Sequence, residues 1–68
     1  MNINKLNEIL ISSKIEHFEN ENFKSFEFEI LNENVTIVTI VFDEPYYEKR
    51  TYYVRDNRID EEEIEFEN

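Results

Sequence analysis

The fold of this chain is organised around one apolar segment, Val35-Thr36-Ile37-Val38-Thr39-Ile40-Val41-Phe42. It is rich in β-branched residues and is apolar on both of the faces that a strand presents, which is typical of a strand in the middle of a sheet. Asp43-Glu44-Pro45 follows directly, and proline cannot continue a ladder of backbone hydrogen bonds. The sequence therefore predicts a central strand over residues 35–42.

The segment before this strand alternates with a period of two. In Ser25-Phe26-Glu27-Phe28-Glu29-Ile30 the apolar residues share one face and the glutamates share the other. This pattern predicts a half-buried strand, and we expect Phe26, Phe28 and Ile30 to be buried. Asn32-Glu33-Asn34 is predicted as the connecting turn, because asparagine tolerates the left-handed backbone in a chain that has no glycine.

The segments after residue 42 continue the sheet. Residues 50–55 form the next predicted strand, and Asp56-Asn57 forms the next turn. The alternation of Glu63-Ile64-Glu65-Phe66-Glu67 favours a terminal edge strand over residues 59–68. A short helix capped by Asp60 and Glu63 remains the alternative for that segment.

The N-terminal segment has helical spacing instead. Ile3, Leu6, Ile9 and Leu10 form one apolar stripe, which predicts a helix over residues 3–13 with Asn2 or Asn4 as its N-cap. Leu6 and Leu10 are expected in the core, and residues 15–22 are predicted as either a short strand or a loop. We therefore predict a single α+β domain over residues 1–68, with a short N-terminal helix packed on a three- to four-stranded antiparallel sheet.

The composition argues against catalysis. There is no cysteine and no glycine, which excludes thiol nucleophiles, cysteine–zinc sites and glycine-rich phosphate loops. His17 is the single histidine, and no hydrolase motif surrounds it. The spacing of the acids matches no calcium loop. We predict that the protein is not an enzyme and has no catalytic residue, metal site or cofactor.

The charge is both large and polarised. Seventeen acids against seven bases give a net charge of −10, and the last ten residues hold six acids and no base. One interpretation is a solvated surface that resists aggregation. The other is a recognition surface, because alternate carboxylates on a strand lie about 6.6–7 Å apart, or about two phosphate steps of a nucleic-acid strand. The candidate partner-binding residues of this segment are Asp60, Glu61, Glu62, Glu63, Glu65 and Glu67.

A second candidate surface follows the central strand. Asp43, Glu44, Tyr46 and Tyr47 would form an acidic–aromatic loop suited to gripping arginine through charge and ring face. The modest basic cluster of residues 49–58 raises the opposite idea of direct nucleic-acid binding. With a pI near 4.3 the chain as a whole repels phosphate, so we predict no direct nucleic-acid binding.

The size, charge and N-terminal segment of the chain resemble a known group of proteins. Met1-Asn2-Ile3-Asn4, followed by Leu6 and Glu8-Ile9, is similar to the start of small acidic phage and mobile-element inhibitors from low-GC Gram-positive hosts, including anti-CRISPR proteins that act on type II effector nucleases. Several such proteins mimic DNA with carboxylates. The resemblance implies that residues 60–67 could stand for phosphates.

Two functions follow as hypotheses. The first is an acidic inhibitor that binds the basic nucleic-acid-binding surface of a bacterial protein or nuclease, acting in the cytoplasm of the host cell without a membrane partner. The alternative is an adaptor, antitoxin or immunity module that binds through a sheet edge and exposed tyrosines, or that forms a homodimer.

Overall fold

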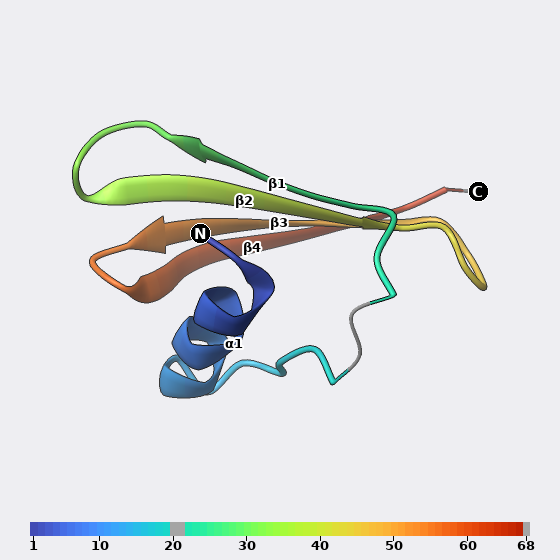
Figure 1. Ribbon diagram of the computed structural model, residues 1–68, viewed down its shortest axis with the longest axis horizontal. Coiled ribbons are helices and arrows are strands. Elements are labelled where there is room, and N and C mark those ends of the chain that lie inside the picture. The colour runs from blue at the N-terminus through green and yellow to red at the C-terminus, as the bar shows by residue number, and fades with distance from the viewer. Residues whose placement is uncertain (20–21, 68) are drawn as a thin grey trace.

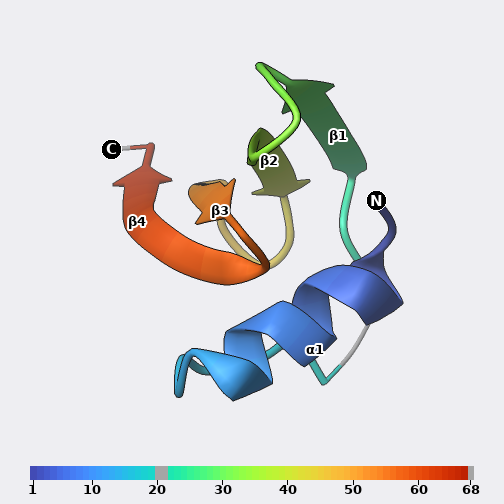
Figure 2. The ribbon, with the colours of Figure 1, turned by 90° about the vertical axis from the view of Figure 1, so that its left-hand side faces the viewer.

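One helix and four strands make up the computed structural model, which describes residues 1–19 and 22–67. The elements are α1 (Ile3–Ser12), β1 (Ser25–Ile30), β2 (Val35–Phe42), β3 (Glu48–Arg55) and β4 (Arg58–Phe66). The strands form one antiparallel sheet in the order β1-β2-β3-β4, and α1 lies against one face of it (Figures 1 and 2). The α+β prediction is confirmed, β2 is an inner strand, and the C-terminal segment is the edge strand β4.

Helix α1 is closed at both ends by local hydrogen bonds. The Asn2 side chain accepts a hydrogen bond from the backbone N–H of Lys5 at 2.9 Å, so Asn2 is the N-cap. At the other end Lys14 has a φ of 60°, and Ile15 N–H donates to the Leu10 carbonyl. This is a Schellman-type ending in which lysine occupies the left-handed position that glycine usually fills.

The core lies between α1 and the adjacent face of the sheet. Leu6 and Leu10 of the helix are fully buried, as predicted, together with Val38, Ile40 and Tyr52 from the two inner strands. Ile3, Ile9 and Val54 complete this cluster, and Phe26 packs partly buried against it.

The predicted burial of Phe28 and Ile30 is wrong. Their side chains are 46% and 66% exposed, although the register places them on the same sheet face as Val38 and Thr36. A ten-residue helix is only about 15 Å long. It lies on the β4 side of the sheet, and β1 is the strand farthest from it (Figure 2). The alternation of β1 correctly predicted a shared face, but no layer covers its end.

The opposite face of the sheet carries no helix in the described part of the chain. On β2 that face presents Val35, Ile37, Thr39 and Val41, which are half-buried by one another and by neighbouring strands. The apolar character of both faces of β2 therefore indicates an inner position in the sheet. It does not indicate that a second layer covers the face opposite α1. We call this surface the open face.

The turns use their polar residues in two different ways. The predicted left-handed asparagine does not occur at residues 32–34; Asn32 Oδ1 instead accepts from the backbone N–H groups of Asn34 and Val35. Positive φ angles occur at Asp56 and Asn57, which form the two-residue turn between β3 and β4. Of residues 15–22, those described form no strand, and residues 20–21 lie outside the described residues.

Candidate functional site

The candidate site on β4 is a line of carboxylates along the edge of the open face. Glu61, Glu63 and Glu65 lie opposite Tyr53, Thr51 and Lys49 of β3, whose side chains point away from α1. All three glutamates are exposed. Alternation along the strand sets neighbouring carboxylates about 6.6–7 Å apart. We call Glu61, Glu63 and Glu65 the carboxylate row.

A β-bulge gives the row its orientation. Ile59 pairs with Val54, but Glu61 pairs with Tyr53, so Asp60 is an extra residue in β4. The shift lets Ile59 face the core while the odd-numbered glutamates that follow face away from it. The backbone N–H of Ile59 donates to Ser13 Oγ at 3.1 Å, which fixes the bulge to the end of α1.

The other predicted residues of the C-terminal segment lie elsewhere. Asp60 Oδ2 is 3.8 Å from Arg55 Nε in a mostly exposed ion pair. Glu62 lies opposite Tyr52 on the face toward α1. Glu67 follows the end of β4 at Phe66, beside the turn between β2 and β3. The structure thus divides the six predicted acids among four environments, and three of the acids form the row.

No internal cation neutralises the row within the described residues. The ion pairs among residues 1–19 and 22–67 join Lys5 to Glu8, Arg50 to Glu48 and Arg55 to Asp60. Lys49 lies opposite Glu65, but no ion pair joins them. Glu27 and Glu29 add two exposed carboxylates at the far edge of the same face. The row is therefore available to an external cation.

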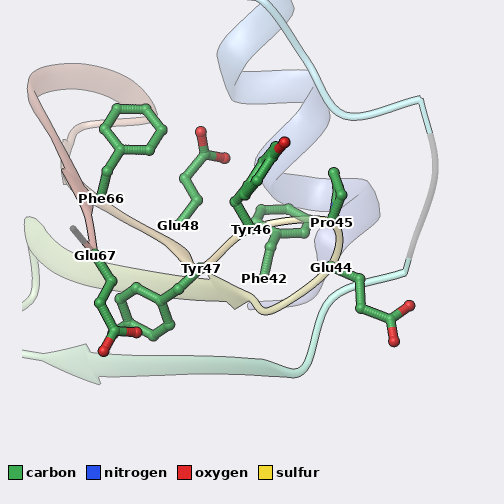
Figure 3. A pocket seen from close by; sticks show the side chains of 8 residues that line it. All are labelled: Phe42, Glu44, Pro45, Tyr46, Tyr47, Glu48, Phe66 and Glu67. Carbon is green, nitrogen blue, oxygen red and sulfur yellow. The ribbon is translucent and has the colours of Figure 1, made fainter.

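A separate cavity of about 390 Å³ opens at the turn between β2 and β3. We call it the turn pocket, and its lining residues are Phe42, Glu44, Pro45, Tyr46, Tyr47, Glu48, Phe66 and Glu67 (Figure 3). It brings three predicted residues of the acidic–aromatic loop together with Glu67 of the C-terminal segment. Asp43 is exposed and does not line it.

Sequence reasoning missed four residues of this pocket, which are Phe42, Pro45, Glu48 and Phe66. Phe66 and Glu48 lie opposite each other in the β3–β4 register, and Phe42 is the last residue of β2, opposite Glu48 on the other side. The pattern assigned Phe42 and Phe66 only to strands and Pro45 to the break after residue 42, and it left Glu48 outside the predicted strand over residues 50–55. Their meeting depends on the pairing of β3 with β4, which the chain's local patterning does not specify.

The charged groups beside the turn pocket are held in place by aromatic residues. Arg50 donates to Glu48 through Nε at 3.0 Å and Nη2 at 3.4 Å, and its guanidinium lies 5.4 Å from the centre of the Phe18 ring. Burial acts to lower the pKa of Arg50, but the Tyr52 hydroxyl and Glu48 outweigh it, so the pKa is raised. Arg50 therefore stays charged and occupies one side of Glu48.

Among residues 1–19 and 22–67, no three histidine, aspartate or glutamate side chains are grouped so that they could hold a metal ion. His17 is exposed. Within the same residues, no helix has the length and apolarity to cross a membrane. No protein-family model, curated protein or solved structure matches the chain.

Proposed function

We propose that this protein is a non-enzymatic inhibitor that binds the basic nucleic-acid-binding surface of another protein, with the carboxylate row in place of phosphates. The observation that carries the proposal is the line formed by Glu61, Glu63 and Glu65. These three exposed carboxylates lie on one face of an edge strand, without an ion pair among the described residues. Arginine and lysine bind carboxylate and phosphate alike.

The shape of the surface supports this function. An edge strand can enter a groove that a whole sheet face could not. The spacing of about 6.6–7 Å corresponds to about two phosphate steps along one nucleic-acid strand. Glu27 and Glu29, about 14 Å away across three strand spacings, extend the negative potential over the open face. A groove lined with lysine and arginine is complementary to this arrangement.

The resemblance to anti-CRISPR proteins suggests the class of target. A type II CRISPR effector holds its heteroduplex in a positively charged channel and reads a short duplex with arginines. An inhibitor of such a nuclease would act in the cytoplasm of a bacterial host. Asp43 and Glu44, in the turn between β2 and β3 beyond the Glu65 end of the row, serve as reserve contacts.

The test is capture from a bacterial lysate on the immobilised protein, with and without competing duplex DNA, followed by a cleavage assay. We expect the captured protein to bind nucleic acid, to be released by the DNA, and to lose its nuclease activity when the chain is added. Retention of the captured protein at saturating DNA would contradict the proposal.

An adaptor that pairs through a sheet edge is the second candidate, and the exposure of β1 favours it. Strand β1 pairs with β2 on one side only, and Phe28 and Ile30 of this strand, with Leu31 directly after it, are exposed. Such an edge can add a strand from a partner or from a second copy. Sedimentation of the purified chain tests the homodimer: Ile30→Lys should abolish a β1-mediated dimer, and a dimer unaffected by it would exclude that edge.

A further inference from the structure

The geometry points to the turn pocket as a binding site for one guanidinium group, supplied by an arginine side chain of a partner. This site lies beyond the carboxylate row, because its residues come from the β2–β3 turn and the end of β4. Its volume of about 390 Å³ is within the usual range for ligand sites. The inference does not depend on phosphate mimicry.

The walls of the turn pocket are aromatic. Tyr46, Tyr47 and Phe66 line it, and Tyr46 is 80% exposed while Phe66 is 64% exposed. Figure 3 shows the Tyr46 and Phe66 side chains on either side of Glu48. The hydrophobic core of this chain is small, yet the large side chains of Tyr46 and Phe66 stay exposed to solvent and do not join it. Rings of this kind attract a cation over their faces.

The charge around the aromatic walls selects a cation over a neutral ligand. Glu67 lies beside Tyr47 in Figure 3, and Glu44 stands at the mouth with its carboxylate toward solvent. No cation within residues 1–19 and 22–67 forms an ion pair with either of them. Glu48 adds a third carboxylate, although Arg50 already occupies one side of it. The pocket therefore offers negative charge next to aromatic faces.

The chain itself shows which cation suits this combination. Arg50, immediately next to the pocket, lies over the Phe18 ring and binds the Glu48 carboxylate through two nitrogens. A planar guanidinium can make both contacts at once, whereas an ammonium is a strongly hydrated point charge. A ring and a carboxylate also lie together in the turn pocket, where Glu67 is beside Tyr47 (Figure 3), but no arginine of the described residues accompanies them. An external arginine completes it.

The experiment is an NMR titration of the ¹⁵N-labelled chain with acetyl-Gly-Arg-Gly-amide. We expect saturable shifts confined to the amides of residues 42–44, 46–48 and 66–67, with a dissociation constant on the order of 1 mM. The same peptide with citrulline, which is neutral and nearly the same shape, should bind at least about tenfold more weakly. The same peptide with lysine in place of arginine should also bind more weakly. Free L-arginine carries an additional carboxylate, so it should compete with the arginine peptide only weakly.

Two variants and two matched controls make the result decisive. Tyr46→Leu removes a ring and Glu67→Gln removes a charge, and each should weaken binding of the arginine peptide several-fold. Tyr46→Phe keeps the ring, and Glu33→Gln removes an exposed charge from the turn between β1 and β2, so neither should change it. Equal binding of citrulline and arginine peptides, or shifts that survive both Tyr46→Leu and Glu67→Gln, would overturn the site. Glu65→Gln weakens partner binding only under the phosphate-mimic proposal, so the two ideas fail separately.

Discussion

The side chain of Asn7 makes two hydrogen bonds to the backbone of Phe18, one through each of its polar atoms. Nδ2 donates to the Phe18 carbonyl at 3.0 Å, and Oδ1 accepts from the Phe18 N–H at 2.9 Å. This contact joins α1 to the segment that returns to the sheet. It also positions the Phe18 ring, whose centre is 5.5 Å from that of Phe42 and 6.1 Å from that of Tyr52.

Replacement of Asn7 should therefore weaken the fold. Asn7→Ala removes both hydrogen bonds and should cost about 1–3 kcal/mol in the free energy of unfolding, because each is worth about 0.5–1.5 kcal/mol. Asn4→Ala is the matched control, since Asn4 is exposed on the same helix. Urea unfolding of both variants tests this, and equal stability of the two would show that the Asn7 contact contributes nothing.

Lys14 occupies a backbone conformation that disfavours any residue with a Cβ. At a φ of 60° glycine has no such penalty, so Lys14→Gly should raise the free energy of unfolding by about 0.5–1 kcal/mol. The same change within the helix, Lys5→Gly, should lower it by about 1 kcal/mol. Thermal unfolding of the pair measures this contrast. A destabilised Lys14→Gly variant would count against the Schellman ending.

Tyr52 should make the stability of the fold sensitive to alkaline pH. Its side chain is fully buried, and its hydroxyl makes no hydrogen bond with any described residue. Burial raises the pKa of Tyr52, Arg50 opposes the shift, and Glu62 adds to it. Above the usual pKa of about 10 the unfolded chain releases this proton while the folded chain retains it, so stability falls as pH rises.

Tyr52→Phe removes this titration. At neutral pH its stability should lie within about 1 kcal/mol of the original chain, because the lost hydroxyl lies near Arg50 and Glu62 but makes no hydrogen bond to a described residue. As pH rises above about 10, the original chain should lose more stability than Tyr52→Phe does. Tyr46→Phe, which alters an exposed residue, should follow the original chain. Parallel pH curves for the original chain and Tyr52→Phe would refute the assignment.

Ile30 and Ile40 provide a direct test of which part of the sheet is covered. Both lie on the face toward α1, but Ile40 is fully buried and Ile30 is 66% exposed. Ile40→Val should cost about 0.5–1.5 kcal/mol, and Ile30→Val should change stability by less than about 0.5 kcal/mol. Comparable losses for the two variants would mean that β1 is covered after all.

The periodicity of the chain was sufficient to predict the fold, because each element follows its own local pattern. The three-residue and four-residue spacing of α1 and the alternation of β1 and β4 are properties of short segments. Burial of Phe28 and Ile30 was mispredicted because it depends on where a helix of only ten residues comes to rest. Hydrophobic alternation identifies a face but gives no information on the layer above it.

The candidate site was predictable only in part for a similar reason. The alternation predicts that Glu61, Glu63, Glu65 and Glu67 share one side of a strand. In the structure the first three lie on one face of β4, and the strand ends at Phe66, before Glu67. The alternation could not place Glu67 beside Tyr47, because their proximity depends on the point at which β4 ends relative to the β2–β3 turn. The bulge at Asp60 also had no sequence signal, since the chain marks it with neither glycine nor proline.

We propose that this protein binds basic surfaces because of how the carboxylate row is arranged, and that its net charge alone is not sufficient. The test compares two triple variants. The row variant carries Glu61→Gln, Glu63→Gln and Glu65→Gln, and the control variant carries Glu8→Gln, Glu16→Gln and Glu33→Gln, at residues that are exposed elsewhere. Each set removes three of the charges behind the net −10, which leaves −7 in both. The measurement is the affinity for the captured nucleic-acid-binding protein at about 50 and 200 mM salt.

We predict that the original chain and the control lose at least about tenfold in affinity over this salt range, because exposed charge pairs are screened. The row variant should bind weakly at both salt concentrations and show a shallower dependence, while remaining folded. Equal affinity and equal salt dependence of the row variant and the control would contradict the claim, because net charge alone would then account for binding.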